Sequence, residues 1–216
     1  MSKKSSFYLR TCAISRGSLR RDCPYDVVFI LNRYFQEMGQ AVEAAGGYVD
    51  KFVGDGMIAL FGLEAANAQP SSQALTAARL MFVRLDALNH AMAAELDAPL
   101  RMGIGIHIGL AVVGEMGYGR ARSLTAIGDT VNIASRLETL SKSYGCDLVV
   151  SEALLRSIGL HLPNALRHEM PIRGRAAPLA AYTLATVHDL PATGAATTSG
   201  LSNARGEASP EILGTR

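Results

Sequence analysis

The segment Val49-Asp50-Lys51-Phe52-Val53-Gly54-Asp55-Gly56-Met57-Ile58-Ala59-Leu60-Phe61 decides the fold of this chain. Two apolar half-strands flank a Gly-Asp-Gly bend, so the segment predicts a β-hairpin with Asp55 at its tip. Glycines on both sides of Asp55 let a bulky anion approach the backbone. A carboxylate held between two strands can bind a divalent cation. Taken alone, the segment fits equally well a surface hairpin whose aspartate serves only the turn.

Two long amphipathic helices are predicted on either side of this hairpin. The first begins near Asp22-Cys23-Pro24, where Asp22 can cap a helix that Pro24 opens, and it ends at Gly46-Gly47. The second begins at Pro70-Ser71-Ser72 and runs to about Ala94. Residues 1–21 form an atypical segment, because Ser, Arg and Lys interrupt every short apolar run and no clean strand emerges.

The segment Leu100 to Leu110 alternates apolar residues with three glycines and a histidine, which predicts a strand with one apolar face. The glycines leave its other face bare. A bare face permits the close approach of a ligand, a metal-bearing loop or another subunit, and it equally permits a helix to pack directly on the strand. The residues alone leave these alternatives open.

Further along the chain, the segment from Asp129 to Glu138 predicts a helix capped by Asp129. Asn132 and Arg136 are four residues apart, so both side chains project from one face of that helix. Short links between strands favour an α+β fold, a ferredoxin-like and mostly antiparallel sheet backed by helices. From residue 187 to residue 216 the chain lacks periodicity and is expected to be a disordered tail.

The composition excludes several classes of function. Of the 216 residues, 49% are hydrophobic and 19% are charged, which is enough apolar material for one sizeable core. A net charge of +2 gives no bulk argument for binding nucleic acid or an acidic membrane. The three cysteines have no metal-ligand spacing and favour a reducing compartment. No apolar run is long enough to form a membrane segment, so we expect a cytoplasmic chain, alone or as a fragment of a membrane-anchored protein.

Four segments together resemble the catalytic domain of class III adenylyl and guanylyl cyclases of the bacterial adenylyl type. They are residues 31–35, 49–56, 126–138 and 172–175, in the family's order and spacing. The resemblance covers residues 22–186 and implies the class III cyclase fold. It also implies a reaction in cyclic nucleotide signal transduction. The ribose 3′-hydroxyl of a nucleoside triphosphate attacks the α-phosphate, pyrophosphate leaves, and two divalent cations, Mg²⁺ or Mn²⁺, assist.

The resemblance also implies a role for individual residues. Asp55 matches one of the family's metal-bridging aspartates. Lys51 and Thr125 match the two residues that read the purine, and this pair resembles the adenine-selecting type, so ATP is the expected substrate. Asn132 is expected to orient the ribose, and Arg136 to balance charge that builds up on the α-phosphate.

Three further residues are expected near the phosphates by the same resemblance. Gly54 belongs to the Gly-Asp-Gly bend. Arg173 or Arg175 is expected to hold the terminal phosphates, and the sequence does not choose between them. The family's active site lies between two domains, with the metal and base-reading residues from one and the asparagine and arginine from the other. A single domain therefore implies a head-to-tail homodimer with two symmetric sites.

The chain departs from the family at its N-terminal end. Cyclases begin with a strand that ends in a second metal-binding aspartate, followed shortly by Gly-Phe-Thr, and residues 1–21 contain neither. A one-base shift over residues 11–19 permits Leu-Cys-Asp-Ile-Ser-Gly-Phe-Thr, which is the pattern that is missing. The hypothesis is that this end is out of frame, and the gene's nucleotide sequence decides it.

The missing aspartate keeps two other functions open. One is a catalytically impaired cyclase-homology domain that binds nucleotide or dimerises as a regulatory module. The other is a ferredoxin-like interaction module that binds no nucleotide. Against the second stand Lys51, Thr125, Asn132 and Arg136, because a scaffold has no chemical need for these polar residues.

Overall fold

The structure is a computed structural model, and it describes residues 2–13, 24–63, 69–171 and 178–191. Its centre is one eight-stranded sheet in the order β2-β3-β1-β4-β6-β8-β7, with β5 paired to β4 outside this path. The strands are β1 (Ser2–Ala13), β2 (Tyr48–Val53), β3 (Gly56–Phe61), β4 (Met102–Met116), β5 (Ser123–Ile127), β6 (Leu148–Ser151), β7 (Leu166–Met170) and β8 (Leu179–Leu184). Every pair is antiparallel except β4 with β6, which confirms the predicted α+β architecture.

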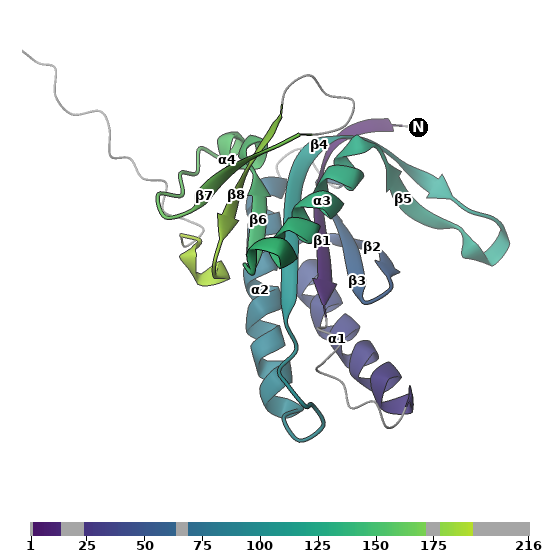
Figure 1. Ribbon diagram of the computed structural model, residues 1–216. Coiled ribbons are helices and arrows are strands. Elements are labelled where there is room, and N and C mark those ends of the chain that lie inside the picture. The colour runs from purple at the N-terminus through teal and green to yellow at the C-terminus, as the bar shows by residue number, and fades with distance from the viewer. Residues whose placement is uncertain (1, 14–23, 64–68, 172–177, 192–216) are drawn as a thin grey trace, which may run out of the picture.

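Helices cover both faces of the sheet (Figure 1). The two long helices α1 (Pro24–Ala44) and α2 (Pro70–Ala91) share the main core with alternate residues of β4, including Ile104 and Ile106. Helix α3 (Asp129–Tyr144) crosses the opposite face. The short helix α4 (Glu152–Ser157) adds Leu154 and Leu155 to the main core. Among the described helices, none combines the length and the apolar character that a membrane crossing needs.

Helix α3 packs directly on the glycine-rich face of β4. A Cβ atom built on Gly105 would lie 2.3 Å from the backbone nitrogen of Glu138 and 2.5 Å from the carbonyl oxygen of Ala134. Gly103 and Gly109 face Ser141 and Thr130 of the same helix at similarly short range. Of the alternatives that the sequence left open, direct helix packing is therefore the one realised, and these glycines are not a ligand surface.

The expectation that residues 1–21 contain no clean strand is wrong for residues 2–13. They form β1, which lies between β3 and β4 and pairs with both. Backbone hydrogen bonds to two neighbouring strands hold this segment in the sheet, although its sequence has weak strand character. Cys12 is level with Gly56, and Ala13 is level with Met102, so β1 ends beside the tip of the predicted hairpin.

Three element boundaries differ from those expected. Asp129 does not cap α3, because the N-cap is Gly128 and no side chain caps that end. The strand expected at 100–110 continues without a break to Met116. The ordered chain also runs past residue 187, because a 3₁₀ helix η2 (Val187–Asp189) with a capping box at Thr186 buries Val187 in the main core.

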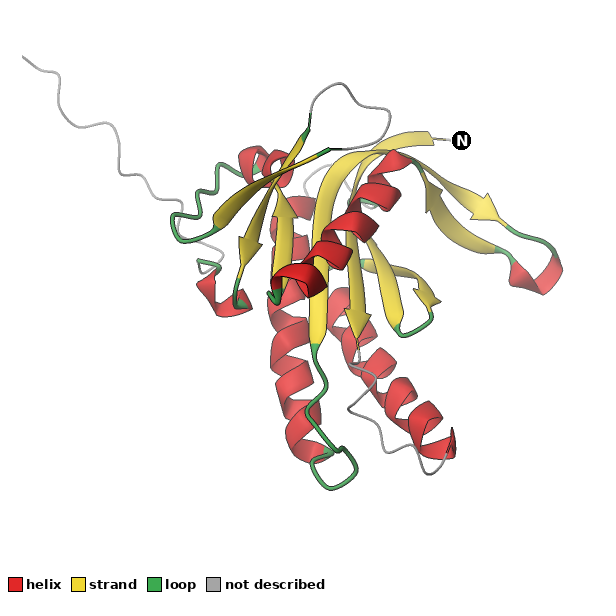
Figure 2. Cartoon of the chain, in the orientation of Figure 1, coloured by secondary structure: helices red, strands yellow, loops and turns green. Residues whose placement is uncertain are grey.

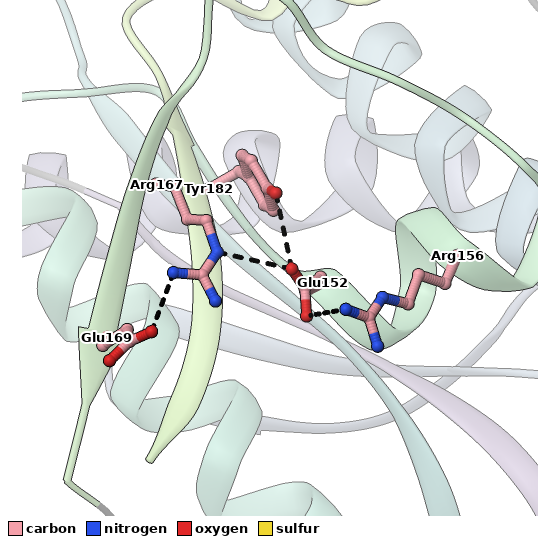
Figure 3. A network of polar contacts seen from close by, with 5 residues as sticks. All are labelled: Glu152, Arg156, Arg167, Glu169 and Tyr182. Atoms are coloured by element: carbon pink, nitrogen blue, oxygen red, sulfur yellow. Dashed lines mark hydrogen bonds and ion pairs between the residues drawn. The ribbon is translucent and has the colours of Figure 1, made fainter.

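Two features flank this core. The ends of β4 and β5 form an arm that projects away from the sheet, and the 3₁₀ helix η1 (Gly119–Ala121) closes its tip (Figure 2). At the other edge, Glu152 at the start of α4 joins α4 to the last two strands (Figure 3). Its carboxylate accepts bonds from Arg156, Arg167 and Tyr182 at 2.8, 3.3 and 3.5 Å. Because the side chains of Arg156 and Arg167 are 76% and 44% exposed, we expect this network to contribute little to stability.

Candidate active site

The hairpin predicted from the sequence is present as β2 and β3. Val53 is level with Gly56, so Gly54 and Asp55 form a two-residue turn. Gly54 has a φ of 63°, a conformation that favours glycine, and its surroundings are open. Asp55 is partly exposed at the tip. The turn therefore presents one carboxylate at the end of the sheet, beside the end of β1.

The structure brings the two predicted base-reading residues together. The Nζ atom of Lys51 donates a hydrogen bond to Oγ1 of Thr125 at 2.6 Å. This bond joins β2 to β5, and the two residues that form it are 74 positions apart in the sequence. Thr125 is 7% exposed, whereas the side chain of Lys51 is 44% exposed. The ammonium group can therefore bind a ligand from solvent while the threonine holds it in place.

A third residue, Asp50, joins this pair, and the sequence analysis missed it. Its Oδ2 accepts a 2.9 Å hydrogen bond from Thr125 Oγ1 and lies 3.6 Å from Lys51 Nζ. Strand alternation would place Asp50 and Lys51 on opposite faces. The pairing register of β2 with β3 shifts between Val49 and Lys51, so Asp50 is the extra residue of a β-bulge. Its position directly before Lys51 was the only available signal.

Asn132 and Arg136 lie on the first two turns of α3, and both are exposed. Their spacing of four places them on one side of the helix. The opposite side carries Ile133, Ala134 and Leu137, which are buried. Because α3 packs against β4, the backbone that carries these two polar side chains is held in place. Both side chains point away from the core of their own chain.

A cleft of about 850 Å³ opens at the end of the sheet that carries Asp55. Its other charged lining residues are Asp86, Arg101, Lys142, Asp147 and His188. The cleft is not lined by the pair Lys51–Thr125, nor by Asn132 or Arg136. Of the candidate site residues that the structure describes, Asp55 alone lines this cleft. Arg173 and Arg175 lie outside the described residues.

Burial raises the pKa of two groups that line this cleft, Asp147 and Cys146. Partial burial raises the pKa of the Asp147 carboxyl, although the backbone N–H of Val187 donates to its Oδ2 at 3.2 Å and opposes the shift. Burial, and then the adjacent Asp147, raise the pKa of the Cys146 thiol. A raised pKa disfavours the reactive thiolate, so Cys146 is not set up as a nucleophile.

The residues available for divalent cations are incomplete. Asp55 provides one carboxylate, and β1 beside it contains no Asp or Glu. Within residues 2–13, 24–63, 69–171 and 178–191, no group of three His, Cys, Asp or Glu side chains could hold a metal ion. Mg²⁺ and Mn²⁺ need several oxygen ligands. The described part of the chain therefore does not fit a two-cation centre, and Asp55 alone would hold a cation weakly.

Comparison with known proteins identifies the class. Residues 13–186 match the family described as the adenylate and guanylate cyclase catalytic domain. Over 148 residues the chain is 36% identical to an adenylate cyclase of Anabaena cylindrica, a match that covers 67% of this chain and 28% of that protein. It is 37% identical over 132 residues to adenylate cyclase 1 of Rhizobium meliloti strain 1021, with 61% and 20% covered.

The solved structures agree with this match. The crystal structure of the guanylyl cyclase Cya2 superposes with a TM-score of 0.70 at 27% identity, covering 86% of this chain and 93% of that one. The chain belongs to the family of class III adenylyl and guanylyl cyclase catalytic domains. It spans 28% and 20% of the lengths of the two curated relatives, so it corresponds to one catalytic module of such proteins.

Proposed function

We propose that this chain is an adenylyl cyclase domain that binds ATP and converts it to cyclic AMP and pyrophosphate, in cyclic nucleotide signalling. The observation that carries the proposal is the Lys51–Thr125 pair, which the fold assembles from two distant strands. Adenine offers an acceptor at N1 and a donor at its exocyclic amine. An ammonium donor beside a hydroxyl acceptor is complementary to that edge.

The proposed chemistry relies on position and charge. Asn132 orients the ribose so that its 3′-oxygen faces the α-phosphorus. That oxygen releases its proton to solvent, forms the new bond to the α-phosphorus, and displaces pyrophosphate. The guanidinium of Arg136 offsets the negative charge that builds up on the α-phosphate oxygens. The backbone at Gly54 leaves room for a phosphate group beside Asp55. The guanidinium group of Arg173 or Arg175 binds the terminal phosphates.

We propose further that two copies assemble head to tail to complete each site. Asn132 and Arg136 are exposed on the surface of their own chain, so a ligand that contacts them is bound on that surface and not in the interior of the chain. The arm exposes large apolar side chains, including Tyr118 at 93% and Ile127 at 59%, which a second copy would cover. Because the cleft at Asp55 is not lined by Lys51 or Thr125, we assign Asp55 of one chain to the base-reading pair of the other. This division departs from the one that the resemblance implied.

A second candidate function rests on the incomplete cation ligands. Among the described residues, Asp55 is the only carboxylate placed at the hairpin tip, and with that carboxylate alone the chain would bind ATP and dimerise but catalyse poorly, as a regulatory cyclase-homology module. Nucleotide binding is common to both functions, because the base-reading pair does not depend on the cations. The two functions differ in turnover alone.

One set of assays distinguishes the two functions. The purified chain is incubated with ATP and Mn²⁺, cyclic AMP is measured, and the melting temperature is recorded with and without nucleotide. Product that disappears in Asp55→Ala supports the enzyme. No product together with an ATP-dependent rise in melting temperature supports the regulatory module. If neither product nor a rise is seen, both proposals are wrong.

A further inference from the structure

We propose that Asp50 is a positioning residue that sets the nucleobase preference of the Lys51–Thr125 pair. This inference rests on the proposed function, because it concerns how the same site chooses adenine over guanine. It adds to that proposal a residue that does not touch the nucleotide. Asp50 acts instead on the two groups that do.

The backbone of β2 is shaped to bring Asp50 into this position. Asp50 is the extra residue of the bulge, so two consecutive side chains, Asp50 and Lys51, both reach Thr125. The side chain of Asp50 is 1% exposed. A nucleotide that contacts the exposed part of Lys51 cannot reach the Asp50 carboxylate, which lies behind the pair.

The hydrogen bonds fix the direction of the Thr125 hydroxyl. An ionised carboxylate can only accept, so the single O–H proton of Thr125 is donated to Asp50 Oδ2 at 2.9 Å. One lone pair of Thr125 Oγ1 accepts the Lys51 N–H at 2.6 Å. The one lone pair that remains can accept a further hydrogen bond. Towards a ligand, Thr125 is therefore an acceptor and not a donor.

The same carboxylate orients Lys51. Its Nζ carries three donors, of which one goes to Thr125, and Asp50 Oδ2 lies 3.6 Å from Nζ as an ion-pair partner. The remaining donors are available to the ligand. The pair then presents an ammonium donor and one acceptor side by side. Adenine offers the complementary order, whereas guanine places an N1–H donor against the ammonium and its O6 acceptor against the Thr125 lone pair.

Stability alone does not account for this carboxylate. Asp50 Oδ1 is buried and has no hydrogen-bond partner among the described residues. Burying a charged group with one unsatisfied oxygen costs free energy that an apolar side chain would not cost. What Asp50 does provide is a fixed proton position on Thr125, which only a group unable to donate can enforce.

The test compares Asp50→Asn and Asp50→Val with the wild-type chain by calorimetric titration with ATP and GTP. The asparagine keeps the size of the aspartate but can donate to Thr125, and the valine removes both polar atoms. Both changes free the hydroxyl to donate to guanine O6. We expect the preference for ATP over GTP to fall by roughly tenfold to a hundredfold. Circular dichroism and the unfolding midpoint verify that each variant is folded.

Glu138→Gln is the matched control. Glu138 is also a buried carboxylate, 3% exposed and 3.4 Å from a lysine Nζ, but it lies on α3 away from the pair. Its variant loses stability in the same manner and must keep the wild-type preference. A measurement without any variant uses inosine triphosphate, which carries O6 and N1–H. The wild-type chain must bind inosine triphosphate at least roughly tenfold more weakly than ATP.

The outcomes separate the two proposals. If the wild type prefers ATP and the folded Asp50 variants keep that preference, the inference is overturned and the proposed function stands. The inference is also overturned if both affinities fall equally, since that indicates a purely structural role, or if inosine triphosphate binds as tightly as ATP. If the wild type binds neither ATP nor GTP, the proposed function fails and the inference fails with it.

Discussion

Lys51 and Thr125 meet through a 2.6 Å hydrogen bond between an edge strand and the base of the arm. The two residues lie on strands that are not paired with each other, and only the folded sheet brings them together. Thr125 is buried, while Lys51 is partly open to solvent. The result is an anchored ammonium group at the surface, which is a suitable recognition element for a flat, polar ring edge.

The first prediction concerns the choice of base. Changing Lys51 to Glu and Thr125 to Cys together reverses the donor and acceptor order, so the double variant is expected to prefer GTP by roughly tenfold. The affinities for both nucleotides, and the rates of cyclic AMP and cyclic GMP formation, are measured. Arg156→Glu, a charge reversal at an exposed residue of α4 that does not line the cleft, serves as the control. An unchanged preference for ATP in the double variant would show that Lys51 and Thr125 do not recognise the base.

The second prediction concerns the division of the site between chains. Asp55→Ala and Arg136→Ala are each expected to weaken ATP binding, by roughly tenfold to a hundredfold for the arginine, whose side chain is exposed and contributes little to stability. Mixed in equal amounts and reassembled, the two variants should recover tight binding at about a quarter of all sites, because half of the dimers are mixed and one of the two sites in each mixed dimer receives both native residues. Calorimetric titration measures the stoichiometry.

Two further mixtures test the same division. Asp55→Ala mixed with Lys51→Ala should also recover about a quarter of all sites, because Lys51 and Asp55 are assigned to different chains. Lys51→Ala mixed with Arg136→Ala should recover none, because each site takes these two residues from the same chain in this assignment. Recovery in the latter mixture, or its absence in the former, contradicts the assignment.

The third prediction supplies the missing carboxylate. Ala13 follows Cys12, which is level with Gly56, so position 13 lies beside the hairpin tip that carries Asp55. Ala13→Asp is expected to raise the Mn²⁺-dependent rate of cyclic AMP formation by roughly tenfold to a hundredfold, since a second acid completes the oxygen ligands. Lys3→Asp, at the other end of the same strand, is the control. A rate that does not rise shows that a second carboxylate is not what limits this chain.

The fourth prediction tests the contact between β4 and α3. Gly105→Ala places a Cβ against backbone atoms that cannot rotate away, so it is expected to lower the free energy of unfolding by about 1–3 kcal/mol or more. Gly114→Ala, on the same strand, meets nothing within 4 Å and is expected to be nearly neutral. Urea unfolding compares the two variants. Equal effects would show that α3 does not rest on this strand.

The fifth prediction concerns pH. Burial raises the pKa of Asp147 in the folded chain, so the folded state retains a proton that the unfolded state has released, and this carboxylate lowers stability as the pH rises through its folded pKa. Asp147→Asn should therefore have a higher melting temperature than the wild type at pH 7. The difference should disappear below the ordinary value of 3.8. A difference that is constant from pH 3 to pH 7 would exclude this origin.

Much of this arrangement could be predicted from local sequence. The hairpin at Asp55, both long helices and the first part of strand β4 follow from alternation, helical spacing, proline and glycine. The prediction that Asn132 and Arg136 share one exposed side of a helix follows from their spacing of four. These features depend on neighbours in the chain, and neighbours are what a single sequence displays.

Other features depend on contacts between distant segments. Strand β1 has little strand character of its own and takes its conformation from two flanking strands. The bulge at Asp50 is a property of the pairing of β2 with β3, so alternation along β2 alone would place Asp50 on the wrong face. The bare face of β4 could not be assigned until the fold placed α3 upon it. The missing second carboxylate, by contrast, was evident from the sequence.

The seating of α3 on the glycines of β4 also limits how the domain can be controlled. A helix whose backbone touches a strand at van der Waals distance cannot slide or rotate without breaking that fit, so Asn132 and Arg136 travel with the sheet as one rigid block. A regulatory signal could then not act by moving α3 within the domain. It would have to change the distance or the orientation between two rigid domains, and so bring their site residues together or apart.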